Sequence, residues 1–287
     1  MNGDPAVRSE RPGRPLILSA SRRTDLPGFH AESCAARVRG RVSRLRTREL
    51  VGVVFWSRHV RPFLPGGALH ALTRRELENP HLNLTVTGLG GGPLEPGVPA
   101  TRDVVERLPE LVDAFHGEGF RIRWRFDPLL AGRSSLETFG RVAEAMAAVG
   151  VETCTFSFPA TRSLKGDLTP AFERAGIRPW REEDRRPFVS SMAAIARSLD
   201  IRLLTCNQPE NARLDPWVAP AACVPRAELE RGHPRGARLD ALGRDRSQRS
   251  ACNCVESEDI GRYETDICRG GCAYCYSKAG GQRDLSG

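Results

Sequence analysis

The chain has 287 residues and a mass of 31.6 kDa, which is enough for one large domain or two small ones with a hydrophobic core. Its 40% apolar and 27% charged residues, with a mean hydropathy of -0.39, exclude a bundle of membrane helices and a disordered chain. The formal net charge is +8, and all but two of the 43 basic residues are arginines. Because these arginines are scattered along the sequence, the charge makes nucleic acid a candidate partner but marks no binding surface.

Six short apolar runs, rich in β-branched or aromatic residues, predict six strands. The runs are Leu16–Ser19, Val51–Trp56, Leu82–Thr87, Ile122–Phe126, Thr153–Phe158 and Ile201–Cys206. Helical periodicity between them predicts helices at Ala31–Leu45, Ala68–Leu77, Arg102–Phe115, Leu136–Val149 and Phe188–Leu199. Ser134 and Glu137 are expected to form a capping box before the fourth helix. This alternation predicts an α/β fold with a parallel sheet, as a full or partial (β/α) barrel.

We expect the barrel to span residues 16–250, between a flexible N-terminal segment, 1–15, and a cysteine-rich segment, 251–287, folded over the barrel mouth. The stretch Arg226–Ser250 has little periodicity and predicts a polar linker across the surface. No secretory signal and no apolar stretch of membrane-spanning length is visible, so we expect a cytoplasmic protein that does not enter a membrane.

The nine cysteines are an odd number in a chain without an export signal, which favours reduced thiols over a disulfide framework. Cys268, Cys272 and Cys275 form a C-x3-C-x2-C motif, with Tyr274 before the last cysteine. Three close thiolates can bind three irons of a [4Fe-4S] cubane and leave the fourth iron open, whereas an electron-transfer cluster takes four cysteines.

This motif resembles the cluster motif of the radical S-adenosylmethionine superfamily. The resemblance implies a cubane whose open iron binds S-adenosylmethionine, and an external electron donor whose electron cleaves that cofactor to methionine and a 5′-deoxyadenosyl radical. It also implies a partial (β/α) barrel. In that superfamily the motif follows the first strand, whereas here it stands near residue 275, so we expect a permuted placement in which this tail folds over the barrel mouth.

Nearly the whole chain, from Leu16 to Ser277, also resembles a bacterial family catalogued as domain of unknown function 1848. The stretches that carry this resemblance are Ser21–Pro27, Val54–Trp56, Thr85–Gly88, Trp124–Pro128, Ser157–Phe158, Gln248–Arg249, Cys252–Cys254, Ser257–Tyr263, the three cysteines and Tyr276. The resemblance implies an iron-sulfur protein akin to radical S-adenosylmethionine enzymes, and it supplies no substrate.

Cys252 and Cys254 leave alternatives open. They are candidates for a fourth cluster ligand, for a second metal or for simple packing, and a fourth ligand would remove the open iron. A structural zinc site is the alternative to the cubane, because zinc needs four ligands and the tail offers five cysteines. The alternative function is therefore a zinc-stabilised module that binds nucleic acid and catalyses nothing.

Reactive side chains of β/α barrels lie where strands end. In the fourth predicted strand, side chains alternate between the two faces, so Ile122, Trp124 and Phe126 are expected to face helices. Arg123, Arg125 and Asp127 are then expected to face the barrel interior. There they would either contact a ligand or form a buried Arg–Asp pair that only fills the interior. The candidates for catalysis are Arg125, Asp127 and Lys165. The candidates for cofactor binding are Ser21, Arg22, Arg23, Asp25, Trp56, Thr87, Glu95 and Asn207, whereas His59 is expected to be a surface residue. By fold-level analogy and basic charge, we expect a nucleotide or nucleic-acid substrate.

Overall fold

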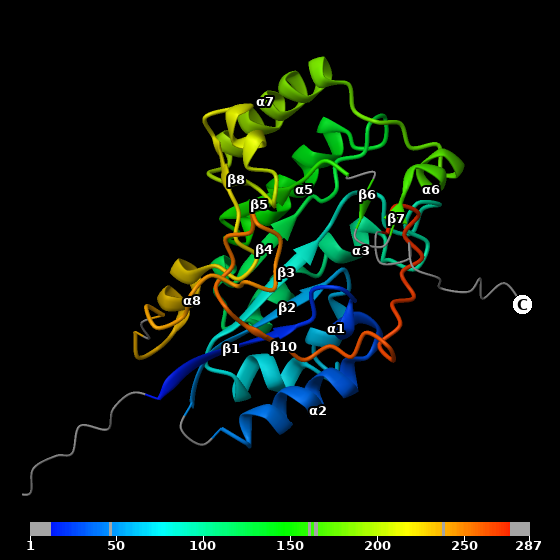
Figure 1. Ribbon diagram of the computed structural model, residues 1–287. Coiled ribbons are helices and arrows are strands. Elements are labelled where there is room, and N and C mark those ends of the chain that lie inside the picture. Colours follow the sequence, from blue (N-terminus) through cyan, green and yellow to red (C-terminus); the bar gives the residue numbers. More distant parts are fainter. Residues whose placement is uncertain (1–12, 46–47, 160–161, 164–165, 237–238, 276–287) are drawn as a thin grey trace, which may run out of the picture.

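The computed structural model describes residues 13–45, 48–159, 162–163, 166–236 and 239–275 (Figure 1). Its centre is an eight-stranded sheet in which every neighbouring pair of strands is parallel. The strands, in sheet order, are β10 (Glu258–Asp259), β1 (Arg14–Ala20), β2 (Arg48–Ser57), β3 (Pro80–Thr85), β4 (Ile122–Arg125), β5 (Thr153–Phe156), β8 (Arg202–Thr205) and β9 (Val218–Pro220). A separate antiparallel pair joins β6 (Arg162–Ser163) to β7 (Gly166–Asp167). The α/β class is therefore confirmed, with β10 and β9 as the two edges of a sheet that does not close.

Helices and short helical turns connect the strands. The α-helices are α1 (Leu26–Phe29), α2 (Ala31–Val42), α3 (Thr101–Val105), α4 (Leu108–Ala114), α5 (Leu136–Ala148), α6 (Thr169–Arg174), α7 (Glu182–Ser198) and α8 (Arg226–Gly232). The short turns are η1 (Arg61–Phe63), η2 (Leu72–Glu76), η3 (Gly119–Arg121) and η4 (Pro209–Arg213). In the described part of the chain, no helix has both the length and the apolar character needed to cross a lipid bilayer.

All six predicted strands are present, with ends that shift by a few residues. The predicted helix at Arg102–Phe115 is instead divided into α3 and α4, because Pro109 favours a new first turn and lacks the N–H of a helix interior. The helix predicted at Ala68–Leu77 is shorter in the structure, where the π-helical turn η2 takes its place. The predicted capping box is also wrong: the side chain of Ser135 caps α5, whereas Ser134 accepts a hydrogen bond from the Leu130 amide.

The outer face of the sheet packs against α2, α5 and α7 in the larger hydrophobic core. On β4, Trp124 is fully buried and stacks on Phe139 of α5, with ring centroids 5.1 Å apart. Phe126 meets the same ring edge-on at 5.3 Å. The predicted alternation of this strand is therefore confirmed on its outer side.

The inner face is covered by α8 and by residues 239–255 in a second core, and the orange segment of Figure 1 crosses the sheet here. Leu229 of α8, with Leu239 and Leu242, packs against Ile17 and Val51 of the sheet. The prediction of a surface linker at Arg226–Ser250 is therefore wrong. Its few apolar residues do not repeat with a helical or strand period, so their burial could not be predicted from periodicity.

His81 is a buried titratable group on β3, and it makes stability depend on pH. Burial, followed by the nearby positive charges of Arg121 and Arg123, lowers the pKa of His81 well below 6.5. The folded chain thus holds a neutral imidazole, whereas the unfolded chain takes up a proton as the pH falls below about 6.5. This contribution to stability is present above that pH and is lost below it.

We therefore expect the free energy of unfolding to fall between pH 6.5 and pH 5, with this histidine contributing up to about 1.4 kcal/mol per pH unit. His81→Gln should flatten that slope. Urea unfolding of both proteins at pH 7, 6 and 5 measures it, and equal slopes would contradict the assignment.

Candidate functional site

Residues 268–275, here called the cysteine loop, carry all three cysteines of the sequence motif. The loop docks on residues 94–97, where the Gly97 amide donates to the Gly270 carbonyl at 3.0 Å and the Ala273 amide donates to the Leu94 carbonyl at 3.0 Å. Gly271 adopts a φ of 66°, in the left-handed region that glycine tolerates. These contacts hold the cysteine loop beside the polypeptide that follows β3.

The thiols of the cysteine loop lie in a partly buried environment. A Cβ atom on Gly270 would lie 3.6 Å from both the Cys268 and the Cys272 sulfur, so both sulfurs lie close to this glycine. Burial raises the pKa of Cys268, although the backbone amides of Gly270 and Asp25 hydrogen-bond to its sulfur. Burial also raises the pKa of Cys272 to about 11, partly opposed by the charge of Arg58. Both groups therefore remain thiols at neutral pH unless a bound cation draws off the proton.

Glu95 is a fully buried carboxylate next to the cysteine loop. Its Oε1 accepts hydrogen bonds from Arg58 at 2.8 Å, from Thr87 at 2.8 Å and from the Tyr274 hydroxyl. Within the described structure, its Oε2 is buried without a hydrogen-bond partner. A buried carboxylate oxygen left unpaired is costly, so this atom marks a position where a donor would bind favourably.

Asp25 organises the loops after β1 and β2. Its Oδ1 accepts from the Gly28 amide and the Ser57 hydroxyl, both at 2.8 Å. Its Oδ2 accepts from the Arg58 amide at 2.8 Å and lies 2.9 Å from His59 Nδ1. The His59 Nε2 lies 3.2 Å from the Gly97 carbonyl, which links this carboxylate to the chain under the cysteine loop. Both carboxylate oxygens of Asp25 thus hold neighbouring loops in place. His59 is part of this network rather than a surface residue.

A cavity of about 610 Å³ opens beside Cys272 and Cys275. The loop before Glu95 contributes Pro93 and Leu94 to its wall, and α6 contributes others, among them Arg174. This volume lies in the range of small-molecule sites. Two of the three predicted ligand cysteines, Cys272 and Cys275, therefore line this space.

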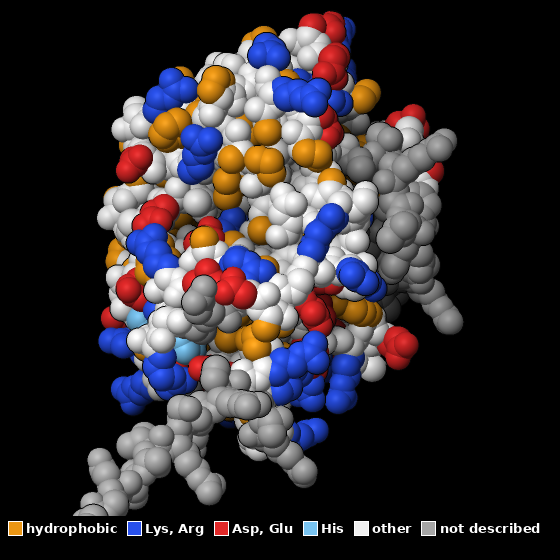
Figure 2. All heavy atoms as spheres, turned by 60° about the vertical axis from the view of Figure 1, so that its left-hand side comes forward, with side chains coloured by type: hydrophobic (Ala, Val, Ile, Leu, Met, Phe, Trp, Pro, Cys, Tyr) orange, Lys and Arg blue, Asp and Glu red, His pale blue; other side chains and the backbone are white. Residues whose placement is uncertain are grey.

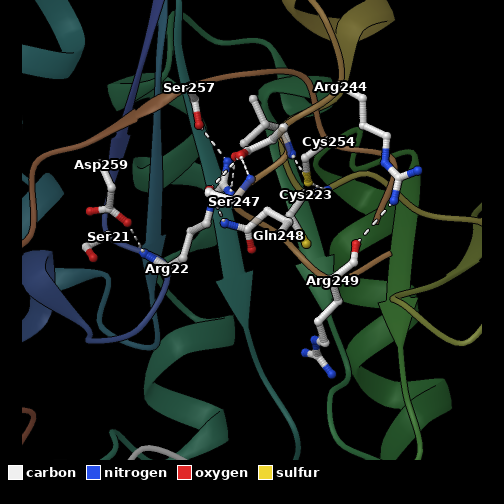
Figure 3. Close-up of polar contacts among 12 residues, drawn as sticks. Ser21, Arg22, Cys223, Arg244, Ser247, Gln248, Arg249, Cys254, Ser257 and Asp259 are labelled. Carbon is white, nitrogen blue, oxygen red and sulfur yellow. Dashed lines mark hydrogen bonds and ion pairs between the residues drawn. The ribbon is translucent and has the colours of Figure 1, made fainter. Parts of the chain in front are cut away.

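The other candidates after β1 are Ser21, Arg22 and Arg23, and they lie in a second region, on the inner face. Arg22 donates to the Ser257 hydroxyl at 2.5 Å (Figure 3). It also donates to Asp245 at 2.7 Å, and its guanidinium lies 5.8 Å from the Trp56 ring centroid. Buried Ser21 donates to the Tyr263 hydroxyl at 3.4 Å, and Arg23 lies 4.6 Å from the same ring. These residues tie the segment around β10 to the sheet.

The interior pair of β4 is placed as predicted, and it has partners from the chain itself. Arg125 forms an ion pair with Asp127, and its Nη1 donates to the Cys223 sulfur at 3.1 Å. Asp127 also accepts a hydrogen bond from Ser157. Both side chains therefore contribute to a packed interior network, as the lumen-filling alternative expects.

Cys252 and Cys254 lie with Cys206 and Cys223, and we call these four residues the inner thiol cluster. The Cys206 and Cys223 sulfurs are 3.7 Å apart, and the Cys254 sulfur accepts from the Cys223 amide at 3.1 Å. Figure 3 shows Cys223 and Cys254 together near Arg22. Sequence reasoning missed Cys206 and Cys223, which lie outside the cysteine-rich segment; their only signal is that each follows a strand at its carboxyl end.

Two candidates remain. Asn207 follows β8 with a φ of 53°, and its Oδ1 is buried without a hydrogen-bond partner in the described structure. Lys165 lies outside the described residues. Among those residues, no group of three or more His, Cys, Asp or Glu side chains is already arranged around one point as a site for a metal ion.

Comparison with known proteins gives one match. A family model described as a domain of unknown function (DUF1848) matches residues 17–277, nearly the full length of the chain. Neither a curated protein nor a solved structure matches the sequence.

Proposed function

The chain belongs to the DUF1848 family, and we propose that it is an iron-sulfur enzyme similar to radical S-adenosylmethionine proteins. Cys268, Cys272 and Cys275 would hold a [4Fe-4S] cluster in this proposal. The observation that carries it is the docking of the loop that holds the three motif cysteines beside a buried carboxylate, one oxygen of which has no hydrogen-bond partner among the described residues. The cluster, when bound, would supply the electron that cleaves S-adenosylmethionine and begins radical chemistry on the substrate.

The thiols of the cysteine loop suit such a group. The Cys268 sulfur receives hydrogen bonds from two backbone amides, and hydrogen bonds to cluster sulfurs are one way in which proteins tune such clusters. The sulfurs of Cys268 and Cys272 both lie close to Gly270, which has no side chain. The raised pKa of Cys272 means that loading must release protons, so we expect loading to be favoured by alkaline pH.

Glu95 is the residue that we assign to the amino group of S-adenosylmethionine. Arg58, Thr87 and Tyr274 occupy one carboxylate oxygen, and the other oxygen has no donor in the described structure. An ammonium group would supply that missing donor and a matching charge. Asp25 has donors on both oxygens, so we assign it a positioning role rather than a ligand contact.

We also propose that the sheet and its helices form a partial (β/α) barrel, with the cysteine-rich segment at its mouth. Its strand order follows the chain from β1 to β9, which supports this likeness. The cysteine loop contacts residues that follow β1, β2 and β3 at their carboxyl ends, the side on which β/α barrels bind ligands.

The distribution of surface charge gives less support to the alternative function, a zinc-stabilised module that binds nucleic acid. Figure 2 shows acidic side chains interspersed among the basic ones over most of the face in view. Several exposed arginines are paired with acids, such as Arg231 with Glu152 and Arg39 with Glu76. Charges mixed in this way give a weaker field for a phosphate backbone than a continuous basic patch.

The test is anaerobic reconstitution of the full chain with iron and sulfide, followed by reduction with dithionite in place of the external electron donor and addition of S-adenosylmethionine. We expect bound iron and sulfide and the formation of 5′-deoxyadenosine, both lost in Cys272→Ala. Cys154→Ala, at a fully buried position on β5, is the matched control and should keep both. A chain that takes up no sulfide, or that binds zinc in place of iron through Cys272, would overturn the proposal in favour of the zinc-stabilised module.

A further inference from the structure

The inner thiol cluster gathers four cysteines from three separate parts of the chain. Cys206 follows β8, Cys223 follows β9, and Cys252 and Cys254 precede β10. The thiols form a connected series: Cys206 is 3.7 Å from Cys223, and Cys254 interacts with both Cys223 and Cys252. All four cysteines are free. Thiolates are the ligands that soft metal ions prefer, and a tetrahedral site takes four of them.

We propose that the inner thiol cluster is a second metal site, for one thiophilic divalent cation of the Zn²⁺ class. In a tetrahedral site with Zn–S bonds of about 2.3 Å, neighbouring sulfurs lie about 3.8 Å apart. The Cys206 and Cys223 sulfurs are already at this separation. The proposal goes beyond the cluster on the cysteine loop and does not depend on it.

Hydrogen-bond donors lie next to two of the four sulfurs, those of Cys223 and Cys254. The amides of Cys223 and Val224 donate to the Cys254 sulfur at 3.1 and 3.3 Å, which fixes the position of one ligand. Arg125 donates to the Cys223 sulfur at 3.1 Å. Hydrogen bonds from cations and amides to coordinating sulfurs orient the ligands and stabilise their charge, and Arg125 thereby gains a role as a positioning residue.

Metal binding would close the series of thiols around one point, an arrangement that the described residues do not already have. The end thiols, Cys206 and Cys252, are partly exposed, and a cysteine side chain turns about a single torsion, χ1. Rotation of these two side chains is therefore the movement that we expect on binding, with release of the thiol protons to solvent.

The test is titration of the reduced, metal-free full chain with Co²⁺, in a variant whose cysteine loop carries Cys268→Ser, Cys272→Ser and Cys275→Ser. We expect one Co²⁺ per chain, with the sulfur-to-cobalt charge-transfer absorption and d–d bands of a tetrahedral thiolate site, displaced by Zn²⁺. Adding Cys254→Ser should weaken binding about tenfold or more. Adding Cys34→Ala, at a buried position on α2, is the matched control and should leave binding unchanged.

Circular dichroism of each variant checks that the fold is retained, and the same titration of the chain with an intact cysteine loop shows whether the serine substitutions themselves disturb the inner site. Absence of thiolate bands in both backgrounds would overturn the proposal. So would binding that Cys254→Ser leaves unchanged, or uptake of iron with sulfide instead of a single ion by the variant without the cysteine loop thiols.

Discussion

Arg58→Met is expected to lower the free energy of unfolding by about 3–5 kcal/mol, the usual cost of removing one partner from a buried ion pair. Glu95 is fully buried, and Arg58 donates to it at 2.8 Å and to the Tyr274 hydroxyl at 3.1 Å. Without the guanidinium, the buried carboxylate keeps only two neutral donors, Thr87 and Tyr274. Urea unfolding at pH 7 measures the loss.

The double variant Arg58→Met/Glu95→Gln separates the ion pair from the packing of the arginine. It should be more stable than Arg58→Met alone, because no charge is left buried. Arg102→Met is the matched control, since Arg102 is exposed and pairs with Glu106 on the same surface. Its effect should stay within about 0.5 kcal/mol. A double variant no more stable than the single one would show that the pair does not behave as a buried charge pair.

The strands of the sheet were predictable wherever a buried strand was long enough to appear in the sequence as a run of apolar residues. Residues 51–56 and 122–126 are examples, because parallel strands buried on both faces read as nearly continuous apolar runs. The edge strands β9 and β10 have three and two residues, too few for any periodicity. Their place in the sheet depends on tertiary contacts, and the same is true of the buried residues between α8 and β10.

The candidate site was predictable only where spacing within the sequence carries chemistry. The C-x3-C-x2-C spacing identifies Cys268, Cys272 and Cys275 directly. Nothing local connects Glu95 to Arg58 and Tyr274, which lie 37 and 179 residues away in the chain. The inner thiol cluster is hidden for the same reason, because the fold alone brings Cys206 and Cys223 beside the later cysteines.

The two groups of thiols differ in how the fold holds them. The inner cluster is built from residues next to the sheet, so its positions are fixed by β8, β9 and the core around Leu229. The cysteine loop has no strand or helix of its own, and it depends on contacts with residues 94–97. Its alignment should therefore be more sensitive to a small change in those contacts than to a change in the sheet.

Gly97→Ala tests that dependence and is expected to release the cysteine loop. A Cβ atom at this position would lie 2.5 Å from the Arg269 carbonyl oxygen and 3.0 Å from the Gly270 Cα, and backbone atoms cannot rotate away as a side chain can. Overpacking of this kind costs about 1–3 kcal/mol, which corresponds to a change of about fivefold to 150-fold in the population of the docked loop. Alkylation of Cys268 and Cys272 in the metal-free chain, followed by mass spectrometry, should become faster by about that factor.

The same variant should lose the iron and sulfide that the wild-type chain retains, because a released loop no longer aligns its three thiols. Gly243→Ala is the matched control, since a Cβ atom there meets no other atom within 4 Å. Alkylation of Gly97→Ala at the wild-type rate would show that the loop keeps its thiols covered without this contact. Faster alkylation with full retention of iron would instead mean that the cluster, once bound, orders the loop by itself, and that docking on residues 94–97 follows loading rather than preceding it.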